Sequence, residues 1–174
     1  MITPFLRHIC VVVFALLPWL ADATELKLSD PLPIGPQVTV GKLANGLTYY
    51  IQKNSRPEKR LELRLVVKAG SILEDEDQLG LAHFTEHMAF NGSTHFKKHE
   101  LVSYLQSIGL KFGADLNAYT GFNETVYILP LPTDNPEHVR KGFLVLEDWA
   151  HGVSFNDADI DLERAIVLEE LRLG

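Results

Sequence analysis

The sequence has a single cysteine, Cys10, so it can form neither an intramolecular disulfide nor a cysteine-based zinc finger. It also lacks any lysine- and arginine-rich tract, and 23 acidic against 16 basic residues give a net charge of -7. Because nucleic-acid binding needs a basic surface to neutralise phosphates, this balance argues against a nucleic-acid partner. Internal repeats and low-complexity segments are missing as well. The 174 residues, 46% of them hydrophobic, are ordinary for one globular domain with its own core.

A long hydrophobic run is also missing, because the N-terminal apolar run covers only the twelve residues from Ile9 to Leu20. A membrane-spanning helix needs about 20 such residues. Arg7 precedes the run, and Ala21-Asp22-Ala23 follows it with the small-x-small form of a cleavage site. We therefore expect a cleaved signal peptide over residues 1–23 and no stable membrane anchor after cleavage. An uncleaved anchor is the alternative.

The mature chain would begin near Thr24 and contain no cysteine. An exported chain without thiols is indifferent to an oxidising compartment, which suits a bacterial periplasm. Three prolines in residues 24–37 predict an extended leader, and the domain itself is expected over residues 38–174.

Strand and helix patterns alternate along this domain. Asn45-Gly46 predicts a hairpin between strands at 38–43 and 47–52. Further strands are expected at 61–67, 114–119 and 125–131, and helices at 78–90, 98–108, 135–150 and from 157 onward. In the third helix the expected core face consists of Val139, Phe143, Leu146 and Trp149. The alternation indicates an α+β domain with a mainly antiparallel sheet packed with helices.

The chemistry-bearing motif is His83-Phe84-Thr85-Glu86-His87, in the first predicted helix. Residues four apart share a helix face, so His83 and His87 can reach one zinc ion, while Glu86 can stand beside it as a general base for bound water. This order reverses the His-Glu-x-x-His metalloprotease motif. The alternative is a plain polar helix face. However, the flanking residues are largely apolar, and burying these groups there would be costly unless they shared a cation.

A catalytic zinc site needs a third protein ligand, and the last helix offers Glu163, Glu169 and Glu170. Glu163 and Glu170 are seven residues apart, so one could bind the metal while the other supports it. The other histidines of the expected mature chain share no helical face with the motif, and we expect them to be solvated: His95, His99, His138 and His151.

Four stretches together carry a resemblance: Asn45-Gly46-Leu47, Gly80 through Phe90, Asn117 through Thr120 with Thr125 through Tyr127, and Glu163-Arg164 with Glu169-Glu170. On them the chain resembles the N-terminal half-domain of the pitrilysin/insulinase family of zinc peptidases, which includes the mitochondrial processing peptidases.

The resemblance implies a role for each matching residue. His83 and His87 match the family's zinc-binding histidines, and Glu86 matches its catalytic base. The family pattern selects Glu170 as third ligand of the one zinc, with Glu163 supporting it and Glu169 as the alternative ligand. The remaining matches are Asn117 and Ala118, on the strand whose edge pairs with a bound peptide; a simple strand end is their alternative role.

The implied function is a zinc endopeptidase that hydrolyses peptides or small unfolded proteins by metal-activated water. One alternative is a non-catalytic partner or assembly subunit on the same fold, and another is a metal-free domain with coincidental histidines. Family members pair this domain with a homologous C-terminal domain or subunit. We therefore expect residues 38–174 to be C-terminally incomplete and to need that half for activity.

Overall fold

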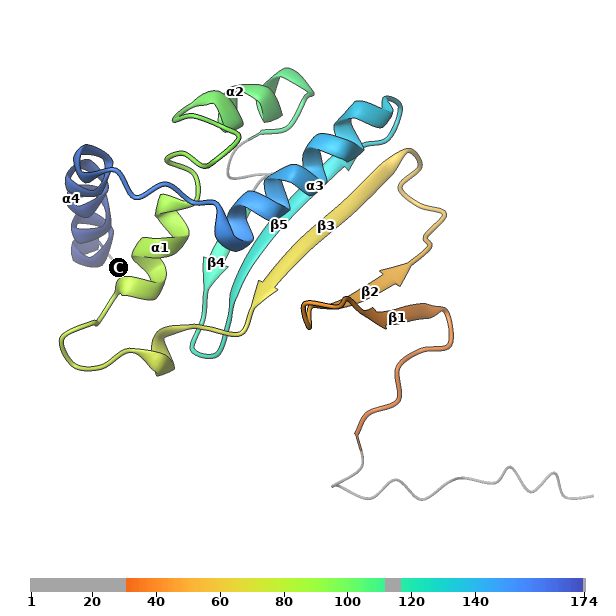
Figure 1. The fold of residues 1–174 in the computed structure, drawn as a ribbon, viewed down its shortest axis with the longest axis horizontal. Coiled ribbons are helices and arrows are strands. Elements are labelled where there is room, and N and C mark those ends of the chain that lie inside the picture. The colour runs from red at the N-terminus through yellow and green to blue at the C-terminus, as the bar shows by residue number, and fades with distance from the viewer. Residues whose placement is uncertain (1–30, 112–116, 174) are drawn as a thin grey trace, which may run out of the picture. The chain divides into compact units, whose positions relative to one another are not determined.

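The computed structural model describes residues 31–111 and 117–173, which form four α-helices and five strands (Figure 1). They belong to two compact units, one ending at Lys53 and the other beginning at Asn54. Every strand pair in the described ranges is antiparallel, which confirms the predicted α+β class. The expected signal peptide lies outside the described residues, and residues 31–37 of the expected leader form neither helix nor strand. Over the described ranges, no helix is long and apolar enough to cross a membrane.

The first unit contains the predicted hairpin. Strands β1 (Val38–Lys42) and β2 (Thr48–Gln52) pair along their whole length. Between them, the Leu43 amide donates to the Leu47 carbonyl at 2.8 Å, and the Asn45 side chain accepts from the Leu47 amide at 3.1 Å. The hairpin therefore closes through the Asn45-Gly46 turn, as its sequence indicates.

The second unit is built on a three-stranded sheet in the order β3-β5-β4. Its strands are β3 (Arg60–Val67), β4 (Asn117–Thr120) and β5 (Thr125–Pro132). These match the predicted strands, except that the first three residues expected for β4 lie outside the described ranges. Among the described strands β4 pairs with β5 alone, so its other edge is unpaired by any of them.

Helix α3 (Pro136–His151) packs against β3 and β5, and most of the core lies between them. The Asn135 side chain caps its N-terminus by accepting from the Glu137 amide at 3.0 Å. At Gly142 the helix backbone approaches β5 closely, because a Cβ there would stand only 2.0 Å from Leu131 Cδ1.

The expectation that Phe143 lies in the core is wrong, because its side chain is 56% exposed. Trp149 is buried as expected, but the other buried residues of α3 each precede a predicted core position by one residue: Gly142, Val145 and Asp148. Close approach at Gly142 turns this row toward the sheet, and Phe143 therefore points away from it.

The remaining helices are α1 (Leu81–Met88), α2 (Glu100–Ser107) and α4 (Asp157–Leu173), with a short 3₁₀ turn at Ser71–Leu73. Helix α1 lies between the β4 end of the sheet and α4, and it contacts both (Figure 1). It is shorter than predicted and begins after Gly80, whose φ of 92° lies in the left-handed region that favours glycine.

A buried carboxylate, Asp148, ties α3 to the loop that follows α1. Its Oδ2 accepts from the Ser93 hydroxyl at 2.5 Å and from the His95 amide at 2.9 Å, while Oδ1 lies 2.7 Å from His95 Nδ1. His95 remains partly exposed, yet its ring is held by this contact. Burial raises the pKa of Asp148, but the hydrogen bonds from Ser93 and His95 outweigh burial and hold the pKa below its usual value.

We expect Asp148→Asn to lower the free energy of unfolding by about 1–3 kcal/mol, because asparagine replaces one of the two accepting oxygens by an NH2 group, which only donates. A group with a lowered folded pKa contributes stability above its unfolded pKa and loses it as pH falls through the folded value. The difference between parent and variant should therefore be full at neutral pH and shrink below about pH 4. Urea unfolding at several pH values measures it. The matched control is Asp161→Asn, whose side chain is 72% exposed and whose effect should stay within about 0.5 kcal/mol. Equal losses in both variants would contradict a special role for Asp148.

Candidate functional site

The N-terminus of α1 is held by one carboxylate from the acidic loop before it. Glu74 Oε2 accepts from the Gly80 amide at 2.9 Å, and Oε1 accepts from the Ala82 amide at 2.7 Å. The first amides of a helix have no partner within the helix, and the helix dipole favours negative charge at this end. Glu74 therefore fixes where α1 starts, and with it the position of the histidines one and two turns later.

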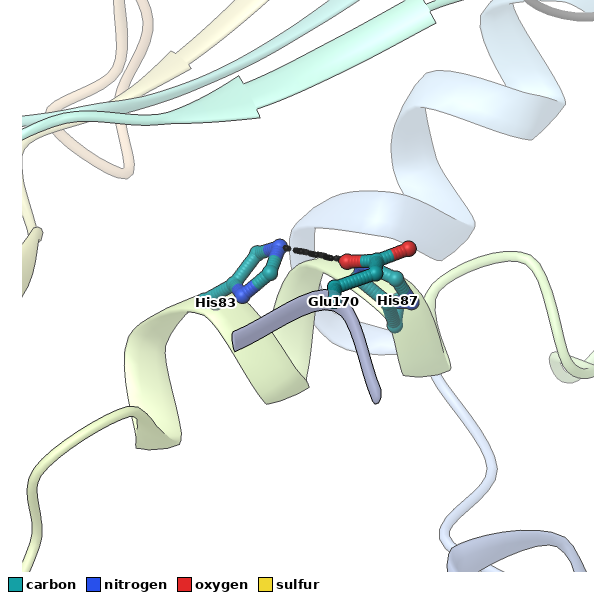
Figure 2. A group of neighbouring side chains, drawn as sticks. All are labelled: His83, His87 and Glu170. Atoms are coloured by element: carbon teal, nitrogen blue, oxygen red, sulfur yellow. Dashed lines mark hydrogen bonds and ion pairs between the residues drawn. The ribbon is translucent and has the colours of Figure 1, made fainter. Parts of the chain in front are cut away.

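Three potential ligands converge between α1 and α4 (Figure 2). His83 Nε2 and His87 Nε2 lie 3.0 Å apart. Glu170 Oε2 lies 3.6 Å from His83 Nε2 and 3.3 Å from His87 Nε2. The first two side chains come from α1, whereas Glu170 comes from the last turn of α4, so the cluster forms only when the helices pack together.

This donor set fits a zinc ion. Atoms bound at about 2.0–2.1 Å to a tetrahedral ion stand about 3.3 Å from one another, which is close to the three observed separations. Two imidazoles and one carboxylate are typical catalytic zinc ligands and leave a fourth position open. The side chains of His83 and Glu170 are 40% and 49% exposed, so that position is open to solvent.

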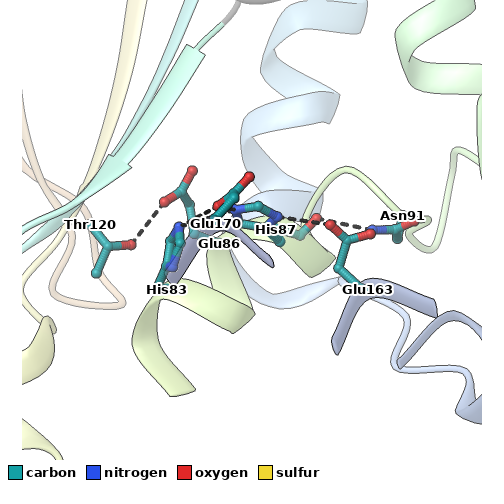
Figure 3. Close-up of polar contacts among 7 residues, drawn as sticks. All are labelled: His83, Glu86, His87, Asn91, Thr120, Glu163 and Glu170. Carbon is teal, nitrogen blue, oxygen red and sulfur yellow. Dashed lines mark hydrogen bonds and ion pairs between the residues drawn. The ribbon is translucent and has the colours of Figure 1, made fainter. Parts of the chain in front are cut away.

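Glu163 lies behind His87. Its side chain is buried, and Oε1 lies 2.8 Å from His87 Nδ1 (Figure 3). Because a carboxylate only accepts, Nδ1 of a neutral His87 carries the hydrogen, and the Nε2 lone pair then faces the point where the three ligand atoms converge. A carboxylate behind a ligating histidine is the usual means of fixing its tautomer and ring orientation.

Glu169 takes no part in this cluster. Its Oε2 accepts from Arg172 at 2.6 Å on an exposed part of α4. Of the glutamates that the sequence left open, the structure therefore brings Glu170 to the two imidazoles and Glu163 behind one of them.

Glu86 is buried, although it stands one residue before His87 on a helix whose histidines are partly exposed. Its Oε2 accepts from the Thr120 hydroxyl at 3.0 Å (Figure 3). Sequence reasoning missed Thr120, although it ends the Asn117–Thr120 stretch. The alternation along β4 was the available signal, since Ala118 and Thr120 share the face that turns toward α1.

A cleft of about 440 Å³ joins these groups to the edge strand. It is lined by the ligand cluster, Glu86 and Phe90 on one side, and by the four residues of β4 on the other. Asn117 is exposed, and its side chain accepts from the Ala118 amide at 2.9 Å. The cleft therefore places a strand edge that no described strand pairs with beside a carboxylate and a potential metal site.

Tyr127 of β5 belongs to the core beneath this cleft and stacks on Trp149. Burial, followed by the negative charge of Glu86, raises the pKa of Tyr127 to about 12. The phenol is therefore neutral at physiological pH and adds no charge beside Glu86.

Comparison with known proteins gives one consistent result. The family model described as insulinase (peptidase family M16) matches residues 49–172. The chain is 41% identical over 162 residues to a probable zinc protease PqqL of Haemophilus influenzae. The aligned residues cover 93% of this chain and 17% of that protein. It is 43% identical over 132 residues to a zinc protease PQQL-like of Arabidopsis thaliana, covering 76% of this chain and 14% of that protein.

Among solved structures, the first half of the periplasmic protease PqqL from Escherichia coli matches with a TM-score of 0.78 at 36% identity. The match covers 82% of this chain and 30% of that one. The chain thus spans less than a fifth of the two curated relatives.

The cluster geometry predicts different outcomes for two adjacent glutamates. Glu170→Ala should abolish stoichiometric zinc binding, because it removes one of three ligands, and so should His87→Ala. Glu169→Ala is the matched control and should leave zinc binding unchanged, because Glu169 faces Arg172. Zinc content after dialysis against a weak chelator measures all three variants. A full equivalent of zinc in Glu170→Ala, or its loss in Glu169→Ala, would show that the ligand set is wrong.

Proposed function

Because the chain belongs to the insulinase family, peptidase family M16, we propose that it forms the zinc-binding part of a metalloendopeptidase. The observation that carries this proposal is the buried Glu86 carboxylate beside two imidazoles and a carboxylate that converge within 4.8 Å. The names of the relatives as zinc proteases support the choice of metal and of reaction.

His83, His87 and Glu170 would hold one zinc ion per chain, with Glu163 orienting His87. The ion would supply Lewis acidity, lowering the pKa of water and polarising the scissile carbonyl. Glu86 accepts a proton from water in the cleft and passes it to the leaving amine, as a general base and then a general acid. Thr120 donates to Oε2 of Glu86, which fixes that carboxylate.

The substrate would be an extended peptide or a small unfolded protein. The four residues of β4, whose outer edge pairs with none of the described strands, line the same cleft as the catalytic groups. A peptide that adds to this edge as a strand is held through its backbone, so sequence preference is loose. Asn117 and Ala118 supply the edge that such a peptide would meet.

A non-catalytic partner subunit on the same fold is the second candidate. Such a subunit has no need of a general base or of a complete ligand set. This chain has Glu86, both histidines and Glu170, and the structure brings them together. The catalytic role is therefore the better supported one.

The whole enzyme would contain more than this domain. The solved first half of the Escherichia coli protease is matched over 30% of its length, and the two curated relatives named above are several times longer than this chain. We propose that residues 38–174 act with a homologous C-terminal half, after a signal peptide at 1–23 and a leader at 24–37. Export to a bacterial periplasm is supported by the periplasmic protease among the relatives.

Glu86→Gln separates chemistry from metal binding, because the amide keeps the size of the side chain but cannot accept the proton. Peptide turnover should fall by about 10²–10⁴-fold while zinc content is retained. The measurement uses this chain together with its C-terminal half. Glu76→Gln, on the exposed loop before α1, is the control and should keep full turnover. Near-normal turnover by Glu86→Gln would mean that another group activates the water.

The chain of residues 24–174 should be inactive alone, although zinc still binds. All three ligands lie within the described residues, but the large apolar side chains of Leu168 and Leu171 on α4 are exposed. Hydrolysis of an unstructured peptide should be undetectable until a matching C-terminal half is added in trans. Chelator-sensitive turnover by residues 24–174 alone would show instead that this domain is a sufficient enzyme.

A further inference from the structure

Glu163 is held from two sides, and only one of them is the histidine. Its Oε1 faces His87 Nδ1, while its Oε2 accepts from the side-chain amide of Asn91 at 2.7 Å (Figure 3). We propose that Asn91 is a positioning residue for the metal site, which acts on His87 through Glu163. The inference rests on the proposed zinc site and adds a residue to it.

The first argument is the orientation of the carboxylate. Glu163 is the buried residue of α4, so each oxygen that is left without a donor costs free energy. With Asn91 on Oε2 and His87 on Oε1, both oxygens are paired and rotation of the group would break two contacts. Without Asn91, the carboxylate is free to turn away from His87 Nδ1. The Nδ1 hydrogen would then lose the acceptor that keeps the Nε2 lone pair facing the ion.

The second argument is that Asn91 itself is held in place. It follows the last turn of α1. Its backbone amide donates to the Met88 carbonyl at 3.0 Å, and its side-chain amide also donates to the His87 carbonyl at 3.3 Å. The next residue, Gly92, accepts from the Ser154 amide at 2.9 Å, in the segment that leads into α4. Asn91 is therefore fixed to both helices that make the site.

The loop beyond Asn91 extends this support into the core. Ser93 and His95 both donate to Asp148 of α3, and the Thr94 amide donates to the Gly152 carbonyl at 2.8 Å. Residues 91–95 thus form a set of hydrogen-bonding positions that reaches the buried carboxylate of α3 at one end and the buried carboxylate of α4 at the other. Asn91 is its last member before the metal site.

The test is zinc affinity in Asn91→Leu, measured by chelator competition on the full chain. Leucine has a similar size but no donor, so a packing role would survive and a positioning role would not. We expect the dissociation constant for zinc to rise about tenfold, at the lower end of losses typical of groups behind a ligand. The absorption spectrum of the Co²⁺-substituted protein should change as well, because the orientation of His87 changes. Asn91→Ala is the second variant, should leucine perturb the fold in circular dichroism of the metal-free chain.

A double-mutant cycle with Glu163→Ala identifies the route. If Asn91 acts through Glu163, then Asn91→Leu has no further effect once Glu163 is alanine. The matched control is Asn156→Leu. It also removes a side-chain amide that donates to a carboxylate of α4, that of Asp159 at 3.4 Å, but this contact involves neither His83 nor His87. Its zinc affinity should equal that of the parent.

The outcomes are distinguishable. Unchanged zinc affinity in both Asn91→Leu and Asn91→Ala, with a parent chain that binds one zinc, would overturn the positioning role and leave the proposed function intact. An equal loss in the parent and Glu163→Ala backgrounds would overturn it too, because Asn91 would then act by another route. A parent chain that binds no zinc would remove both the proposed function and this inference.

Discussion

One buried carboxylate determines how the last helix meets the rest of the protein. Within its described residues, α4 buries Glu163 and leaves most of its large apolar side chains exposed. Helices usually dock by an apolar stripe, but here the contact between α1 and α4 is centred on Glu163, His87 and Asn91. Glu170 follows Glu163 by seven residues on α4, two turns along the same face, so its position follows from that contact. The convergence of all three ligand atoms therefore depends on a polar interaction rather than on core packing.

Local patterns in the sequence predicted the elements well. The Asn45-Gly46 turn closes its hairpin, and the Asn135 cap begins α3 at the next residue. Such features depend on neighbours within a few residues, which a sequence displays directly. The spacing of His83 and His87 is predictable for the same reason, since both lie on one short helix.

Contacts between distant segments could not be predicted in that way. Thr120 meets Glu86 across 34 residues, and Asn91 meets Glu163 across 72. Alternation along β4 indicates the face on which Thr120 lies but not its partner, and Asn91 belongs to no periodic pattern. The prediction that Phe143 lies on the core face of α3 was wrong for a related reason. Hydrophobic periodicity favoured Phe143, but the close approach of Gly142 to Leu131 determines which row of residues faces the sheet. The choice between Glu169 and Glu170 likewise needed the family pattern or the packed helices, because both are glutamates on the same turn.

The edge strand β4 also bears on self-association. An unpaired strand edge can pair with the edge of another copy, and long flat edges are the ones that aggregate. Within the described residues β4 has four residues, which at about 3.3 Å per residue gives roughly 13 Å of backbone available for pairing. A dimer that joined two sheets through so short an edge would form few hydrogen bonds. These would do little to offset the translational and rotational entropy lost on association. The described edge of β4 thus offers a second folded sheet few hydrogen bonds, whereas a flexible chain could also contact the cleft beside it.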